Sequence, residues 1–153
     1  MYKKILVPLD GSELAECVLP HVESIAKGCG VKNVILVRAL EPYMSSYAQI
    51  YLSDEQRKEA DERAERAARE YLDQVASRIK LDGVQVQKQF ITGSPAESIA
   101  EYATKNDTDL IIISTHGRSG ISRWVWGSVA DRILRSAYVP VLMVRAPGCV
   151  PNI

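Results

Sequence analysis

Glycines and arginines crowd one segment near the carboxyl end of the chain, STHGRSGISRWVWGS at residues 114–128. Glycine lets the backbone adopt positive φ and approach a ligand closely. If a helix begins near Ser128, the amides of Gly127, Ser128 and Val129 are expected to be unpaired and to lie where the helix dipole attracts anions. The segment therefore predicts an anion site, with these contributing residues: Gly117, Arg118, Gly120, Arg123, Gly127, Ser128 and Val129.

A helix dipole alone is too weak to hold an anion tightly. It supplies about 0.3–1 kcal/mol at an exposed site, whereas micromolar binding needs about 8 kcal/mol. Most of the binding energy must come from hydrogen bonds and from burial of a base or ribose in an apolar slot. A nucleotide fits this requirement better than free phosphate does, although the chain has neither a Walker A loop nor a G-x-G-x-x-G motif after its first apolar run.

Apolar patterns predict the strands that must position this segment. Unbroken aliphatic runs predict buried strands, and the alternation in VQVQKQF predicts a strand covered on one side only. The predicted strands are residues 5–9, 34–40, 84–90, 110–113 and 140–144.

Helices are predicted between successive strands. Helical spacing begins at Ala15, and Pro20 predicts either a kink near residues 16–20 or a late helix start. Capping boxes predict two further helix starts, at Ser53 and at Ser94, and the last helix is expected to open at Ser128. The helix after Ser53 carries this predicted buried stripe: Ala60, Ala64, Ala67, Tyr71, Val75 and Ile79.

This alternation predicts a doubly wound, Rossmann-like α/β domain, with a five-stranded parallel sheet and helices on both faces. The first and fourth strands are apolar throughout and the third is half polar, which fits the strand order 3-2-1-4-5. Ligands bind such sheets outside the carboxyl strand ends where the order reverses, here between strands one and four. The strand-end residues expected to face the glycine-rich segment are Pro8, Leu9, Asp10, Ala39, Ile113 and Ser114.

Nearly the whole chain resembles the universal stress protein family. The resemblance rests on KKILVPLDGS, on GSPAESI, and on HGRSGISRWVWGSVADRIL followed by VPVLMV. ATP-binding members carry Gly, two residues, Gly, nine residues, and then Gly followed by Ser or Thr. Gly117 and Gly127-Ser128 match the second part, whereas Ser114 stands where the first glycine would be. Its Cβ would crowd the ligand if positive φ were required there.

The resemblance implies a homodimeric regulator of the stress response that binds ATP, with Mg²⁺ able to accompany the phosphates. It places Asp10 at the ribose or adenine end and the Ala39 backbone at the adenine edge. It assigns to the phosphates Gly117, Gly127, Ser128 and Val129. Arg118 and Arg123 are added on charge and position, and the downstream protein partner is unknown. The alternative is a non-nucleotide-binding interaction module, because some family members bind no nucleotide.

Several of these features also have plain structural explanations. Glycines between a strand and a helix are common in α/β folds, so the loop alone fits a simple connection equally well. Asp10 with Glu13 matches a capping box at the start of the first helix. His21 and His116 are solitary, so the chain does not support an efficient hydrolase, although slow ATP turnover stays open.

Composition narrows the class of protein. The 153 residues are expected to form one domain, residues 1–153, and equal totals of 19 basic and 19 acidic residues favour neither nucleic acid nor an anionic membrane. There is no long apolar run or signal-peptide pattern, and the three cysteines lack metal-ligand spacing. We therefore expect a cytoplasmic protein.

The last predicted strand is apolar on both faces, yet the proposed order places it at a sheet edge. An exposed apolar edge strand invites pairing with another chain. We therefore expect a symmetric partner to cover it. The family resemblance implies the same arrangement, a homodimer through residues 139–145.

Overall fold

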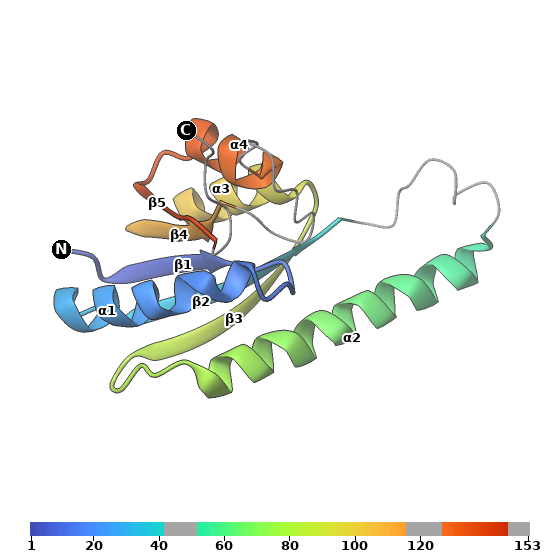
Figure 1. Ribbon diagram of the computed structural model, residues 1–153. Helices are drawn as coiled ribbons and strands as arrows, with labels where there is room; N and C mark the ends of the chain where they lie inside the picture. The colour runs from blue at the N-terminus through green and yellow to red at the C-terminus, as the bar shows by residue number, and fades with distance from the viewer. Residues whose placement is uncertain (42–51, 116–126, 147–153) are drawn as a thin grey trace.

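The computed structural model describes residues 1–41, 52–115 and 127–146. Strands and helices alternate along these ranges, as Figure 1 shows. The strands are β1 (Lys4–Pro8), β2 (Asn33–Leu40), β3 (Gln85–Thr92), β4 (Leu110–Ser114) and β5 (Val141–Val144). The helices are α1 (Leu19–Cys29), preceded by the 3₁₀ turn η1 (Ala15–Val18), then α2 (Asp54–Arg78), α3 (Pro95–Lys105) and α4 (Ser128–Ser136).

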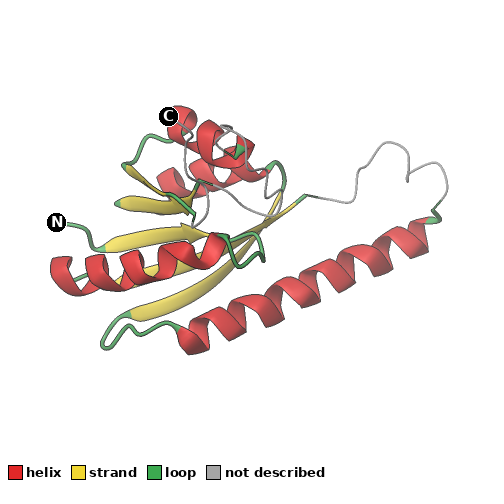
Figure 2. Cartoon of the chain, in the orientation of Figure 1, coloured by secondary structure: helices red, strands yellow, loops and turns green. Residues whose placement is uncertain are grey.

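The strands form one parallel sheet with the order β3-β2-β1-β4-β5, which confirms the predicted doubly wound α/β fold. Two hydrophobic clusters separate on its faces, one packed against α1 and α2 and the other against α3 and α4. Figure 2 shows the resulting layers of helix, sheet and helix. All five residues of β4 are buried, as expected for a central parallel strand covered on both faces.

Pro20 delays the first α-helix, as predicted. A 3₁₀ turn comes first, and α1 then begins at Leu19 with Pro20 in its first turn, where the missing N–H costs nothing. The capping box at Ser53 is also present, because its hydroxyl accepts from the Gln56 amide and the Gln56 side chain accepts from the Ser53 amide. The second capping box is wrong in detail: Ser94 is the N-cap of α3, but its hydroxyl donates to the Glu97 carboxylate.

The predicted apolar stripe of α2 is only partly correct. Buried positions are found only in the carboxyl-terminal half of the helix, at Ala68, Leu72 and Val75, whereas Ala64 and Ala67 are exposed. Figure 1 shows the reason, since the amino-terminal part of α2 extends past the end of the sheet. Periodicity identifies one face of a helix, but the length of the sheet decides how much of that face is covered.

Candidate functional site

An opening lies between β1 and β4 because these strands separate toward their carboxyl ends. They are paired only at Ile5–Leu110 and Leu6–Ile111. Beyond this point β1 continues along β2, with the Leu9 amide donating to the Val37 carbonyl at 2.9 Å. Strand β4 continues along β5 instead, as far as Ser114 opposite Val144. The neighbouring pairs diverge where the strand order reverses, which is where ligands bind in sheets of this class.

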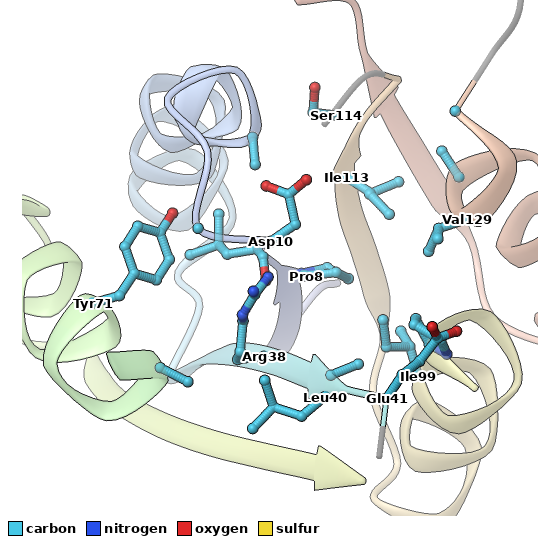
Figure 3. Close-up of a pocket in the computed structure, with 18 of the residues that line it drawn as sticks. Pro8, Asp10, Arg38, Leu40, Glu41, Tyr71, Ile99, Ile113, Ser114 and Val129 are labelled. Atoms are coloured by element: carbon cyan, nitrogen blue, oxygen red, sulfur yellow. The ribbon is translucent and has the colours of Figure 1, made fainter. Parts of the chain in front are cut away.

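A cleft of about 860 Å³ occupies this opening, within the roughly 300–1,000 Å³ of small-molecule sites. Its walls come from the ends of β1, β2 and β4, from α2 on one side, and from the amino ends of α3 and α4 on the other (Figure 3). Segments a hundred residues apart therefore meet in one cleft. Nine predicted site residues line it: Pro8, Leu9, Asp10, Ala39, Ile113, Ser114, Gly127, Ser128 and Val129.

Asp10 stabilises a tight turn at the end of β1. Its Oδ1 accepts hydrogen bonds from the Ser12 amide at 2.9 Å and the Ser12 hydroxyl at 2.6 Å. The Ser12 hydroxyl oxygen in turn accepts from the Ala15 amide at 3.2 Å. The capping-box interpretation expected Asp10 to bond the start of the first helix, but it is Ser12 that makes this side-chain contact to η1. Glycine follows Asp10 because Gly11 has φ +87°, in the left-handed region.

The amino end of α4 forms the opposite wall. Its first intrahelical bond runs from the Asp131 amide to the Gly127 carbonyl, so the amides of Ser128, Val129 and Ala130 precede the bonded turns. The expectation for Gly127 needs correction, because its amide donates to the Thr115 carbonyl at 2.6 Å and is not unpaired. This bond joins the end of β4 directly to the start of α4.

Ser114 does not need the conformation of a glycine. It is the last residue of β4 and is not among the described residues with positive φ. The residue is 6% exposed, and the Cys17 thiol of η1 lies 3.5 Å from its hydroxyl. The serine side chain is therefore directed toward η1. The sequence analysis expected its Cβ to crowd the ligand only if the residue had positive φ, and this condition is not met.

Arg38 and Tyr71 are two of the cleft-lining residues that were not predicted as site residues from the sequence. Arg38 comes from β2 and is the one cationic side chain among the described residues that line the cleft. Tyr71 comes from α2, where burial and the nearby Glu16 carboxylate raise the pKa of its hydroxyl. Side chains alternate between the two faces of β2, so the sequence could have indicated that Arg38 faces α2, opposite to Ala39. The sequence does not show that β1 ends beside Arg38, which is what brings this side chain into the cleft.

Four predicted site residues lie outside the described ranges: Gly117, Arg118, Gly120 and Arg123. Within the described ranges, no three His, Cys, Asp or Glu side chains are grouped closely enough to hold a metal ion. None of the helices in the described part of the chain has the length and apolar composition that a bilayer crossing requires.

The parallel sheet, with a cleft where its strand order reverses, places the chain in the class of doubly wound α/β domains. The chain belongs to the universal stress protein family, because the model of that family matches residues 1–145. This match confirms the resemblance carried by the sequence motifs.

Individual relatives agree with this assignment. The chain is 32% identical over 154 residues to universal stress protein MJ0531 of Methanocaldococcus jannaschii, covering 96% of this chain and 84% of the relative. It is 31% identical to Sll1388 of Synechocystis, covering 94% and 98%. The solved structure of M. jannaschii MJ0577 superimposes with a TM-score of 0.82 at 27% identity, covering 100% and 99%. An Archaeoglobus fulgidus universal stress protein, solved in complex with dAMP, gives 0.57 at 26% identity, covering 93% and 97%.

Proposed function

We propose that this chain is a cytoplasmic, homodimeric stress-response regulator that binds ATP in the cleft between β1 and β4. The observation that carries the proposal is that Asp10 and the amino end of α4 line the same cleft. A carboxylate suits ribose hydroxyls, and the first amides of a helix suit phosphate oxygens. One mononucleotide could engage both walls at once.

The residues divide into three groups in this proposal. Asp10 holds the ribose, and the end of β2 at Ala39 provides the adenine edge. The amides of Ser128 and Val129 receive phosphate oxygens, and Gly127, the N-cap of α4, has no side chain to obstruct them. Outside the described ranges, the proposed contributors are Gly117, Arg118, Gly120 and Arg123. The A. fulgidus relative in complex with dAMP supports an adenine nucleotide as the ligand class.

A Mg²⁺ ion is proposed only as a companion of the phosphates. Magnesium commonly uses one or two protein carboxylates together with substrate phosphates. Asp10 and Glu41 are the carboxylates among the described residues that line the cleft, which makes this mode compatible with the site. The ion would neutralise phosphate charge and hold the triphosphate in one conformation.

Calorimetry and thermal unfolding with ATP test the proposal. At a hundredfold excess over Kd, ligand binding stabilises the folded state by about 2.7 kcal/mol. For a domain of this size that corresponds to a rise in Tm of about 5–11 °C. GTP at the same concentration serves as the control for a polyphosphate without adenine. No heat and no shift at millimolar ATP would refute nucleotide binding and favour an interaction module of the same fold.

Dimerisation is proposed through the β5 edge, residues 139–145. Strand β5 pairs with β4 on one side only, and its residues Val141, Leu142 and Met143 are partly exposed. Two large apolar side chains lie close by in the sequence, Tyr138 at 91% exposure and Leu134 at 43%. A second copy would cover this edge and pair its strand. Sedimentation at micromolar concentration should give a dimer, and a monomer alone would refute this part of the proposal.

A further inference from the structure

Arg38 reaches from β2 to the turn that carries Asp10. Its Nη1 donates to the Leu9 carbonyl at 3.4 Å, and its Cζ lies 3.7 Å from the position that a Cβ on Gly11 would occupy. The guanidinium therefore covers both the residue before Asp10 and the residue after it. Figure 3 shows the Arg38 side chain extending from the strand toward Asp10.

This contact joins two parts of the cleft wall that local structure does not join. The turn is held from within by the bonds of Asp10 Oδ1 to Ser12, which shape it but do not attach it to β2. The backbone ladder between β1 and β2 ends at the Leu9 amide. Beyond that bond, Arg38 provides a side-chain attachment of the Asp10 turn to the sheet.

The charges favour the same arrangement. Asp10 and Arg38 are residues of opposite charge, and Figure 3 shows them near each other in the part of the cleft that Tyr71 of α2 lines. A guanidinium is always charged and presents several donors in a fixed plane, which suits it to hold a carbonyl and an adjacent carboxylate-bearing turn together.

We infer that Arg38 is a positioning residue that holds Asp10 in the orientation required to bind ribose hydroxyls. This inference rests on the proposed nucleotide site and deepens it, because it assigns discrimination of the sugar to an Arg38–Asp10 unit. Arg38 acts through Asp10 and need not touch the nucleotide. Its loss should therefore weaken only ligands that have the hydroxyls that Asp10 contacts.

The test compares ATP with 2′,3′-dideoxy-ATP by isothermal titration calorimetry on the full chain. Arg38→Gln should weaken ATP binding by about tenfold, and binding of the dideoxynucleotide by less than about twofold. Asp10→Asn should give the same pattern, and adding Arg38→Gln to Asp10→Asn should cause no further selective loss. Arg63→Gln, at a 77% exposed arginine of α2, is the matched control and should change neither affinity.

A second variant tests the same turn without removing Arg38, in case Arg38→Gln impairs folding. Gly11→Ala strains the same turn, because Gly11 has φ +87°, but it leaves both charges in place. It should also weaken ATP selectively, while thermal unfolding confirms that each variant is folded. A purely structural role for Arg38 would lower the affinity for both nucleotides equally.

The outcomes separate this inference from the proposed function. Equal loss for ATP and the dideoxynucleotide, or no loss for either, overturns the positioning role while nucleotide binding stands. Equal affinity of the unmodified protein for the two nucleotides also overturns the positioning role, because Asp10 then makes no favourable contact with the ribose hydroxyls. If the unmodified protein binds neither nucleotide at millimolar concentration, the proposed function fails and the inference fails with it.

Discussion

Asp109 joins the two strands between which the cleft opens. Its Oδ2 accepts hydrogen bonds from the backbone amides of Lys3 and Lys4, each at 2.8 Å, across more than a hundred residues of sequence. These two backbone bonds hold the pKa of the Asp109 carboxyl below its usual range. The contact sits at the amino ends of β1 and β4, opposite the end where the strands diverge. Asp109→Asn should therefore loosen the strand pair that supports the site.

The size of the effect follows from the two bonds. A sheltered hydrogen bond to a charged group contributes about 1.5–3 kcal/mol. Asp109 is partly exposed, so solvent screening reduces this severalfold, and a neutral amide oxygen retains roughly half of the remainder. The net loss is about 1 kcal/mol, which lowers Tm by about 2–4 °C for a domain of this size.

The pH dependence has a definite sign. Because the folded-state pKa is lowered, ionised Asp109 contributes its full stability above the unfolded pKa of about 3.9. That contribution is lost as pH falls through the folded-state pKa. The Tm difference between the unmodified protein and Asp109→Asn should be constant from about pH 5 to 8 and shrink below pH 4.

Differential scanning fluorimetry at pH 7, 5 and 3 measures this difference. Asp107→Asn is the matched control, because Asp107 is exposed and has φ +49°, a conformation that Asn tolerates. It removes the same charge two residues away and should leave Tm within about 1 °C. Equal Tm values for Asp109→Asn and the unmodified protein at pH 7 would refute the reasoning, as would a deficit that persists unchanged at pH 3.

Three further predictions concern the cleft and its support. Ser128→Asp should repel phosphate and abolish ATP binding in calorimetry. The same change should stabilise α4 by about 0.3–1 kcal/mol, because a negative charge is favourable at the amino end of a helix. Ser136→Asp, at the other end of α4, is the control and should leave ATP binding intact. Ser114→Gly should cost about 0.5–1 kcal/mol in chemical denaturation and change ATP affinity by less than about threefold, because the serine side chain is directed toward Cys17. A large gain in ATP affinity of Ser114→Gly would instead show that the serine side chain crowds the nucleotide. Ile112→Ala, at a fully buried site of β4, should cost about 2–5 kcal/mol, and a smaller loss would mean that the core collapses around the cavity.

Local sequence patterns determined the architecture. The aliphatic run from Leu110 to Ile113 can only be satisfied by burial on both faces, and the half-polar strand from Gln85 must lie near an edge. Pro20 and Ser53 mark helix starts because a missing donor and a capping hydroxyl act within one turn. These effects are short-ranged, so they are readable from the sequence without knowledge of the fold.

The sequence also predicted, through topology, that two opposite walls of the candidate site meet. Once the strand order was inferred, Asp10 and Ser128 had to meet, because the carboxyl ends of parallel strands share one edge. The positions of Gly117 and Arg118 lie outside the described residues, so their roles stay predictions.

Only the tertiary structure decided which groups pair with one another at the site and how much of each helix is covered. The Gly127 amide is taken by Thr115, and the Ala64 face of α2 stays uncovered because that helix extends past the sheet. Arg38 reaches the Asp10 turn only because β1 ends beside β2 at Leu9. Periodicity tells which face a residue occupies, but strand register and element length decide what lies opposite that face. Those quantities arise from long-range pairing, which no local pattern of residues encodes.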